Sequence, residues 1–319
     1  MKLLIVGAES AVGKELVKQL QQRGVDHFAP EPGRIDARDP LSVAKVITQC
    51  EPDQVVNLAS YRAGSQLAIL EAEKNPQECD AINHIQASVI AQVCDHLNIP
   101  LVHLSSAYVF NGDKKLGYNE LDIAKPVGVY GATSLLGEEA IAKVLSKHII
   151  VRTGWIFGAG QDELIRRWLT EAREAEGAVT VLRRKFSPTP VEDVARVLMA
   201  IAHQVDCHAN VWGVYHYCGL ETKRESEFVQ HVLKLAAQHN ESIYKLLDHL
   251  SLNLLRADPP EIANTTLATK KIFDTFGIKQ RSWHGSLQAL IKTLAKTPEV
   301  RVSEAAVTKT QPDTSEAKV

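Results

Sequence analysis

The 319-residue chain lacks the features of disulfide-rich, zinc-binding and membrane-spanning proteins. Its five cysteines lie far apart and form no Cys-x-x-Cys pair: Cys50, Cys79, Cys94, Cys207 and Cys218. An odd number of isolated cysteines favours reduced thiols over a disulfide framework, and we expect no metal site. No apolar run reaches the length that a bilayer requires, so we expect no membrane partner.

An excess of either charge is also absent. The 36 Lys and Arg residues against 38 Asp and Glu residues give a formal net charge of −2. Without a global positive field, the sequence gives no indication of a nucleic-acid partner. The apolar run at residues 3–6 is too short for the core of a secretion signal, so a cytoplasmic protein is expected.

Apolar runs of strand length alternate with helical patterns through the first half of the chain. The apolar runs lie at residues 2–7, 25–29, 54–59, 101–105 and 148–153, and the helical patterns at 12–22, 41–50, 79–97 and 129–146. This alternation is typical of α/β folds with helices on both faces of a parallel sheet. We therefore predict a Rossmann-type, doubly wound parallel sheet over residues 1–157.

Beyond Gly158 this rhythm loosens. Helical patterns at residues 162–176, 191–204, 224–238 and 286–296 are mixed with apolar runs at 178–182 and 213–218. We predict that residues 187–212 return to the Rossmann domain and that 158–186 and 213–296 form a smaller C-terminal lobe. Residues 297–319 are polar with few large apolar groups, which predicts a disordered tail.

The segment Gly7-Ala8-Glu9-Ser10-Ala11-Val12-Gly13 lies between the first predicted strand and the first predicted helix. A dinucleotide-binding turn needs glycine where the backbone approaches a pyrophosphate, and amide groups at the helix N-terminus. Ser10 replaces the middle glycine of Gly-x-x-Gly-x-x-Gly with a hydroxyl that can donate to phosphate. The predicted cofactor contacts in this turn are Gly7, Ser10, Ala11, Val12 and Gly13.

The choice between NADP and NAD stays open at this point. Glu31 follows the second predicted strand, where an acid holds a ribose 2′-hydroxyl and favours NAD. Arg34 is close enough to accept a 2′-phosphate and favour NADP. Both residues also suit an ordinary solvated loop.

Several further segments follow one another in a set order. They are Asn57-Leu58-Ala59-Ser60-Tyr61, Ser105-Ser106-Ala107-Tyr108-Val109-Phe110, Tyr130-Gly131, Arg152-Thr153-Gly154-Trp155 and Ser187-Pro188-Thr189-Pro190. Their order and spacing resemble the dTDP-4-dehydrorhamnose reductase family of extended short-chain dehydrogenases, over roughly residues 1–295. The regulatory β subunit of methionine adenosyltransferase is a relative of that family.

The resemblance implies NAD(P)H-dependent reduction of a nucleotide-linked 4-keto-6-deoxy sugar, bound by the smaller lobe, as in dTDP-rhamnose biosynthesis. It implies that Tyr130 is the general acid and that Ser106 hydrogen-bonds the substrate oxygen. The residues that it places on the cofactor side are Asp36 (at the adenine end), Asn57, Ala59, Tyr61 and Tyr130.

Four departures from the family pattern bear on function. Ser10 replaces the middle glycine, and Ala107 occupies a position that is acidic in the family. Ser134 stands where the family's Tyr-x-x-x-Lys has the lysine that supports the tyrosine and holds the nicotinamide ribose. Residues 258–264 lack the arginine that the family has ahead of an asparagine, and acidic residues in its place would repel a diphosphate. Arg62 is a candidate for a replacement cation near the ribose.

Three functions remain open. The first is a working reductase of a nucleotide-sugar, and the second is a catalytically degenerate nucleotide-binding subunit that regulates a protein partner. The third is an oxidoreductase or epimerase that acts on another substrate. We take the first as our prediction and the second as its main alternative, with a homodimer as the other expected assembly.

Overall fold

The computed structural model describes residues 1–31, 33–36, 39–62, 67–207 and 209–296. Six strands form a central sheet in the order β10-β5-β4-β3-β1-β2, and all neighbours are parallel. The strands are β1 (Lys2–Val6), β2 (Asp26–Phe28), β3 (Gln54–Asn57), β4 (Leu101–Ser106), β5 (His148–Thr153) and β10 (Gly213–Tyr217). The prediction of a doubly wound parallel sheet is confirmed. The chain changes direction between β1 and β3, which creates a switch point at the carboxyl ends of these strands.

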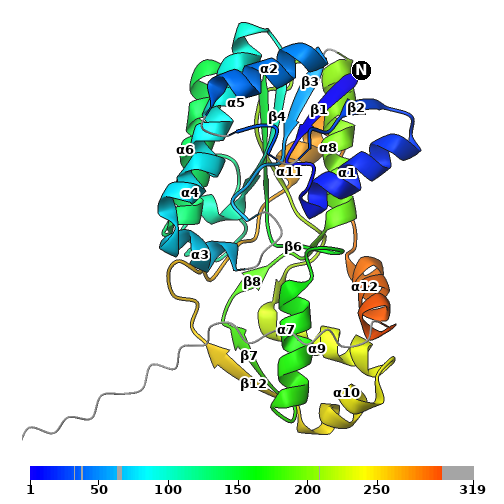
Figure 1. Ribbon diagram of the computed structural model, residues 1–319. Coiled ribbons are helices and arrows are strands. Elements are labelled where there is room, and N and C mark those ends of the chain that lie inside the picture. Colours follow the sequence, from blue (N-terminus) through cyan, green and yellow to red (C-terminus); the bar gives the residue numbers. More distant parts are fainter. Residues whose placement is uncertain (32, 37–38, 63–66, 208, 297–319) are drawn as a thin grey trace, which may run out of the picture.

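Helices cover both faces of this sheet (Figure 1). The helices on one face are α1 (Ala11–Gln22), α8 (Val191–Asp206) and α11 (Lys270–Phe276), and those on the other are α2 (Pro40–Cys50), α5 (Gln86–His96) and α6 (Val129–Val144). Each face has its own apolar core, with Leu16 and Leu198 buried on the first and Ile90 and Ile141 on the second. The strands are buried between two helical layers, which explains why they are continuous apolar runs.

The helical pattern predicted over residues 79–97 is divided into three pieces. These are α4 (Pro76–Asp80), a π-helical turn η1 (Ala81–Ile85) and α5. The short helix α3 (Ala68–Lys74) precedes them and was not predicted. The π turn inserts one extra residue into the helical ladder, a feature that is frequent at functional sites. It places the buried side chain of Asn83 toward α6.

The placement of β10 differs from the prediction, which assigned residues 213–296 to the smaller lobe. β10 is the edge strand of the central sheet and pairs with β5 from Gly213 opposite Ile149 to Tyr217 opposite Thr153. Ile272 of α11 packs into the core of the same layer. The edge of β5 requires a hydrogen-bonding partner, and β10 supplies it. Residues 213–217 and 270–276 therefore belong to the Rossmann layer.

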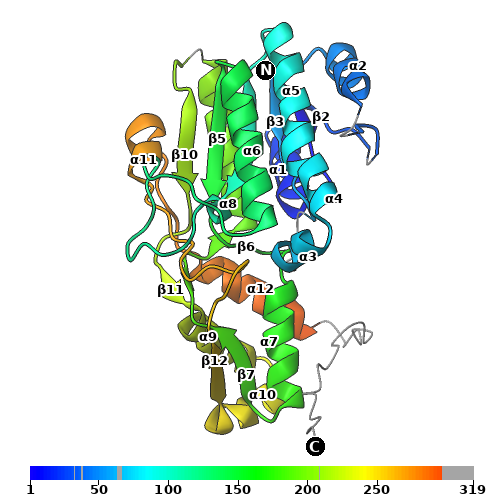
Figure 2. The ribbon, with the colours of Figure 1, turned by 90° about the vertical axis from the view of Figure 1, so that its left-hand side faces the viewer.

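The smaller lobe lies beside the carboxyl ends of the sheet strands (Figure 2). Its elements are α7 (Glu163–Glu174), β7 (Ala178–Leu182), α9 (Glu225–Ala237), α10 (Glu241–Leu246), η3 (Leu247–His249), β12 (Ser251–Leu255) and α12 (His284–Lys296). Trp168, Phe228 and Trp283 are buried in a core of its own.

Short strand pairs join the two parts. They are β6 (Ile156–Phe157) with β9 (Thr189–Pro190) and β8 (Lys185–Phe186) with β11 (Lys223–Arg224). The 3₁₀ turn η2 (Ala107–Val109) follows β4 and packs against α6. Among the described residues, no helix is long and apolar enough to cross a membrane. The predicted disordered tail, residues 297–319, lies outside the described residues.

Candidate active site

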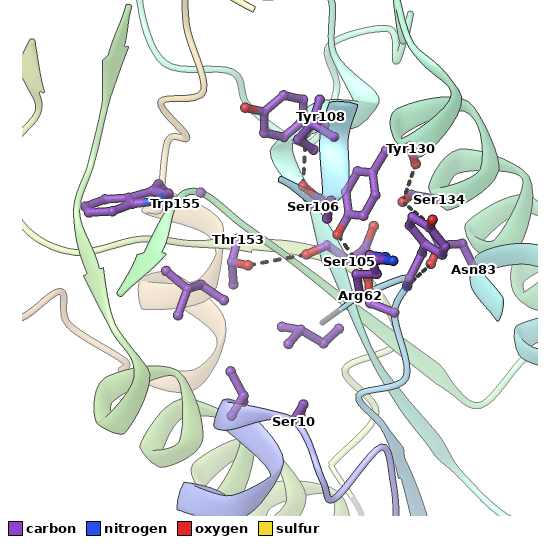
Figure 3. A pocket seen from close by; sticks show the side chains of 18 of the residues that line it. Ser10, Arg62, Asn83, Ser105, Ser106, Tyr108, Tyr130, Ser134, Thr153 and Trp155 are labelled. Atoms are coloured by element: carbon purple, nitrogen blue, oxygen red, sulfur yellow. Dashed lines mark hydrogen bonds between the residues drawn. The ribbon is translucent and has the colours of Figure 1, made fainter. Parts of the chain in front are cut away.

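A pocket opens at the carboxyl ends of the central strands, on the side that faces the smaller lobe (Figure 3). It lies beside the switch point between β1 and β3, where folds of this kind bind ligands. The predicted site residues that line it are Ser10, Val12, Ala59, Tyr61, Ser106 and Tyr130. Ser10 lies across the pocket from Tyr130 and Ser134 in Figure 3. One pocket therefore joins the predicted phosphate turn to the predicted catalytic residues.

Gly7 and Gly13 lie where the backbone leaves no room for a side chain. Gly7 has a φ of +77°, and a Cβ on it would lie 2.6 Å from the backbone nitrogen of Ala59. A Cβ on Gly13 would lie 2.4 Å from the carbonyl oxygen of Gly7. The turn before α1 is thus packed against the end of β3, and only glycine fits at these two positions.

Ser10 is the N-cap of α1. Its hydroxyl oxygen accepts a hydrogen bond from the Gly13 backbone N–H at 3.0 Å, and its hydroxyl donates to the Gly7 carbonyl oxygen at 2.7 Å. From the sequence, this hydroxyl was predicted to donate a hydrogen bond to phosphate. In the structure it donates to the Gly7 carbonyl oxygen instead. The cause is local, because a serine at this position satisfies an amide that the helix leaves without a partner.

Two other amides at the start of α1 are available to a ligand. Ala11 and Val12 are the first residues of the helix, and their N–H groups find no acceptor among the residues that the structure describes. Both residues are buried, and Val12 lines the pocket. Free amides at the positive end of a helix dipole bind anions. This turn therefore fits the pyrophosphate of a dinucleotide.

Asn57 shapes the end of β3 rather than the pocket wall. Its Oδ1 accepts a hydrogen bond from the Ala59 N–H at 3.1 Å, and its Nδ2 lies 3.1 Å from Nδ1 of His103. Burial lowers the pKa of His103 to about 4, so the ring is neutral at pH 7 and its Nδ1 can accept from Asn57. These contacts hold Ala59 against the turn that contains Gly7.

Asp36 lies outside the residues that line the pocket. It is exposed just before α2, and its backbone N–H donates to the Ser42 hydroxyl oxygen at 3.0 Å. Its role at the adenine end of a cofactor stays a prediction.

Tyr130 and Ser106, the two predicted catalytic residues, both face the pocket. Tyr130 lies in the first turn of α6, and its phenol oxygen is 2.9 Å from the Ser60 hydroxyl. Burial raises the pKa of Tyr130, and the Ser60 hydrogen bond opposes that rise. Ser106 ends β4, where its hydroxyl oxygen accepts from the Tyr108 N–H at 3.2 Å. The phenol is protonated at neutral pH and lies in the same pocket as a second hydroxyl.

Ser134 turns back onto its own helix. Its hydroxyl donates to the Tyr130 carbonyl oxygen at 2.7 Å, and its side chain is buried. Asn83 of the π turn donates from Nδ2 to the Thr133 hydroxyl at 3.1 Å, and its Oδ1 accepts from the Tyr61 N–H at 2.7 Å. Sequence reasoning missed Asn83, whose only signal was a polar residue among apolar helical positions. It ties α6 to the loop that carries Tyr61.

Among the described residues that line the pocket, the charged ones are Arg62 and Arg184. Arg62 has a φ of +45°, and its Nη1 lies 2.6 Å from Glu71 Oε2. Its side chain is 52% exposed, so it can move toward or away from a bound ligand. The structure thus brings the candidate replacement cation to the pocket that contains Tyr130.

Arg184 follows β7 and is held by two carboxylates. Its Nε donates to Glu225, and its Nη1 donates to Glu261 Oε2 at 2.7 Å. The Tyr108 hydroxyl donates to the same Glu261 oxygen at 2.8 Å, and burial together with this carboxylate raises the pKa of Tyr108. Sequence reasoning missed this network. The run Arg183-Arg184-Lys185 ahead of the Ser187-Pro188 motif was the available signal.

Comparison with known proteins decides the family. The profile described as "RmlD substrate binding domain" matches residues 1–296. The chain belongs to this family. The dTDP-4-dehydrorhamnose reductase of Escherichia coli is 28% identical over 316 residues, which cover 94% of this chain and 100% of the relative.

Solved structures share the fold of this RmlD-family chain. A dTDP-4-dehydrorhamnose reductase from Clostridium acetobutylicum has a TM-score of 0.79 at 24% identity, over 92% of this chain and 99% of that one. A dTDP-4-dehydrorhamnose reductase from Bacillus anthracis in complex with NADP has a TM-score of 0.73 at 22% identity, over 91% and 96% of the two chains. The resemblance inferred from the sequence motifs is confirmed.

For a member of the RmlD family, the chain departs from the expected pattern of basic residues at one place in the pocket and one place beside it. On α6, the lysine position holds Ser134, whose hydrogen bond closes on the helix backbone. The family pattern has an arginine in the segment that corresponds to residues 258–264. This chain has no arginine there, and Glu261 of this segment pairs with Arg184. Both departures change the charge presented to a ligand, while the glycine turn, Tyr130 and Ser106 are retained.

Proposed function

We propose that this chain reduces the keto group of a nucleotide-linked 4-keto-6-deoxy sugar with NADPH or NADH. The observation that carries the proposal is a single pocket lined by the start of α1, the Tyr130 phenol and the Ser106 hydroxyl. Its relatives carry the name dTDP-4-dehydrorhamnose reductase, and the relative from Bacillus anthracis holds NADP. A reductase of this kind works in the cytoplasm, where its reduced cofactor is made.

The residues at the start of α1 suit the nicotinamide cofactor. The free amides of Ala11 and Val12 bind its pyrophosphate, and Gly7 and Gly13 let the backbone approach closely. Ala59 and Tyr61, at the end of β3, form the wall on the ribose side. When bound, the cofactor supplies the hydride that the keto carbon accepts. None of these residues distinguishes NADPH from NADH.

Tyr130 supplies the proton that converts the reduced keto oxygen into a hydroxyl. Its raised pKa keeps the phenol protonated at neutral pH, so it is available as a general acid. Ser60 donates to the phenolate oxygen once the proton has left, because the two oxygens are 2.9 Å apart. Ser106 holds the substrate oxygen within reach of the phenol. Without a lysine at position 134, the phenolate lacks the cation that the family pattern places beside it, and we expect slow turnover.

The same feature supports a second candidate function. The Ser134 hydroxyl donates a hydrogen bond to the Tyr130 carbonyl oxygen, so position 134 provides no cation for the phenol. The glycine turn before α1, in contrast, is retained. A nucleotide-binding subunit that regulates a protein partner, or a homodimer without turnover, would keep the turn and lose the lysine. NADPH binding is common to both functions, whereas turnover belongs to the first alone.

The test is oxidation of NADPH and NADH at 340 nm with dTDP-4-dehydrorhamnose, beside cofactor binding followed by nucleotide fluorescence. A reductase predicts turnover by the wild type, loss of turnover in Tyr130→Phe and unchanged cofactor affinity in that variant. Ser106→Ala is expected to lower kcat with the affinity for cofactor retained. Cofactor binding without turnover in the wild type would refute the reductase and favour the regulatory subunit.

A further inference from the structure

A second cavity lies against the active pocket on the side of the smaller lobe. It is lined by the loop at residues 112–115, the segment between β7 and β8, the start of α9, and residues 254, 263 and 264. Arg184 lines both this cavity and the pocket of Tyr130. A ligand longer than a single sugar can therefore extend from one cavity into the other past this guanidinium.

This second cavity is strongly basic. Its lysine and arginine side chains are Lys114, Lys115, Arg183, Arg184, Lys185 and Arg224, and Asp113 is the carboxylate among the described lining residues. Asp122 pairs with Lys114, and both Glu225 and Glu261 pair with Arg184, so the excess positive charge of the cavity lies on its other lysine and arginine side chains. Within the described ranges, no ion pair is found for Arg183, Lys115 or Arg224. A concave surface with uncompensated positive charge attracts an anion.

The guanidinium of Arg184 is fixed in place before any ligand arrives. Its side chain is 10% exposed, and carboxylates from two different segments hold its Nε and Nη1. Nη2 makes no hydrogen bond to a residue that the structure describes, and Nη1 lies 3.5 Å from the Tyr108 hydroxyl. An oriented guanidinium with a free N–H edge is suited to phosphate oxygens, and its preorganisation lowers the entropic cost of binding.

We propose that Arg184 and the basic cavity beside it bind the diphosphate of the nucleotide-linked substrate. This inference rests on the proposed function. The reacting sugar lies beside Tyr130 and Ser106, and the diphosphate lies at Arg184, with Arg183 and Lys115 facing its outer oxygens. The missing arginine of residues 258–264 is thus replaced from another segment. Glu261 orients this substitute, and the unpaired charges of Arg183 and Lys115 offset the negative charge that Glu261 brings.

The experiment is isothermal titration calorimetry with dTDP alone, which contains the diphosphate and lacks the reacting sugar. The wild type is expected to bind dTDP, and Arg184→Gln is expected to bind it about 10- to 100-fold more weakly, because charge-assisted hydrogen bonds are lost. Arg183→Gln/Lys115→Gln, a change of two exposed side chains, is expected to weaken binding about fivefold or more.

Arg256→Gln is the matched control. This arginine is in the same lobe, is 85% exposed, pairs with Asp258 and lines neither cavity. The control removes one positive charge, and its dTDP affinity is expected to equal that of the wild type. NADPH affinity is expected to be unchanged in every variant, since the cofactor turn lies at the other end of the pocket.

Two results would overturn the proposal. One is a wild type that does not bind dTDP, and the other is wild-type affinity in the Arg183→Gln/Lys115→Gln variant. Arg184→Gln leaves Glu225 and Glu261 without their cation, so the fold of this variant is checked by thermal melting. If Arg184→Gln does not fold, the Arg183→Gln/Lys115→Gln variant is the deciding test. Bound dTDP without keto-sugar turnover would refute the reductase and leave this site standing, so the two failures are distinguishable.

Discussion

The Ser134 hydroxyl donates a 2.7 Å hydrogen bond to the carbonyl oxygen of Tyr130, one turn earlier in α6. The position from which a lysine would reach the phenol and the cofactor ribose therefore carries a side chain that is satisfied within its own helix. Among the described residues, the phenol oxygen of Tyr130 keeps Ser60 as its hydrogen-bonding partner. In the family pattern one lysine links proton donation to cofactor anchoring, and position 134 of this chain provides no such link.

Ser134→Lys is expected to raise kcat/KM for the keto sugar by about tenfold or more, because it restores a cation beside Tyr130 and the ribose. The gain is measured by NADPH oxidation at 340 nm. Ser134→Met, which adds similar length without charge, is the control and is expected to lower activity or leave it unchanged. Equal gains in the two variants would show that packing, rather than charge, is responsible.

The pH profile separates these variants further. The general acid must be protonated, so activity falls as pH rises through the pKa of Tyr130. Burial raises that pKa above its usual value of 10.0, and the wild-type profile is expected to show no loss from this group up to about pH 10. A lysine at position 134 lowers the pKa of the phenol, so the loss is expected to begin at lower pH in Ser134→Lys and not in Ser134→Met. Coincident profiles would contradict the assignment of Tyr130 as the acid.

Gly13→Ala is expected to weaken NADPH binding by about tenfold or more, because the new Cβ meets the Gly7 carbonyl oxygen at 2.4 Å and distorts the turn. The measurement is fluorescence titration with NADPH. Gly285→Ala is the matched control, since a Cβ there has no heavy atom within 4 Å and the residue lies in helix α12. That variant is expected to bind NADPH normally and to gain up to about 1 kcal/mol of stability.

The buried pair of Glu138 and Arg152 supports the carboxyl ends of β4 and β5. Arg152 donates from Nε and Nη2 to the Glu138 carboxylate, with the shortest contact at 2.6 Å, and both side chains are buried. Arg152→Met leaves the carboxylate without its cation and is expected to lower the free energy of unfolding by about 3–5 kcal/mol in urea titrations.

Two companion variants test that explanation. Glu138→Leu/Arg152→Met removes both charges and is expected to recover most of the loss. Arg166→Met removes a half-exposed ion pair with Asp162 and is expected to change stability by less than about 1 kcal/mol. Equal losses in Arg152→Met and Arg166→Met would contradict the importance of burial.

Acid is expected to destabilise the fold through His103. Burial lowers the pKa of this ring to about 4 in the folded chain, against 6.5 for an unperturbed histidine. The unfolded chain therefore binds a proton that the folded chain does not between these two values. Stability is unaffected above pH 6.5 and falls as pH drops toward 4, by on the order of 3 kcal/mol.

Urea unfolding between pH 4 and 8 measures this effect. His103→Gln has no titrating ring and is expected to show a shallower fall over the same range. A fall of equal steepness in the variant would assign the acid sensitivity to other groups. His216, whose pKa burial lowers to about 3, remains in both chains and contributes equally.

The strands of the sheet could be predicted from the sequence where a short apolar run between two helical patterns is enough to identify a buried strand. Strands β1 and β3–β5 are short buried apolar runs between helical patterns, and the glycine turn follows β1 directly. β10 has the same kind of sequence, yet its place depends on the free edge of β5, more than 60 residues earlier. A local pattern can identify such a strand but cannot assign it to a sheet.

Two parts of the site could not be predicted from the local sequence, because they too depend on contacts between distant segments. The π turn depends on Asn83 bonding to Tyr61 and Thr133, which belong to other segments of the chain. The run Arg183-Arg184-Lys185 has the composition of a solvated surface loop. The Arg184 side chain is only 10% exposed, because Glu225 and Glu261 pair with it when the smaller lobe packs against the sheet. Tertiary contacts, rather than sequence spacing, create these two features.

The position of β10 sets the time at which this protein can finish folding as it is synthesised. The central sheet needs residues 213–217 for its edge and α11 for its apolar layer, although its first strand begins at Lys2. Until residue 217, about two-thirds of the way along the chain, has left the ribosome, β5 exposes an unpaired edge on which another chain can pair. Fragments that stop after the Rossmann motifs at residue 157 are therefore expected to aggregate.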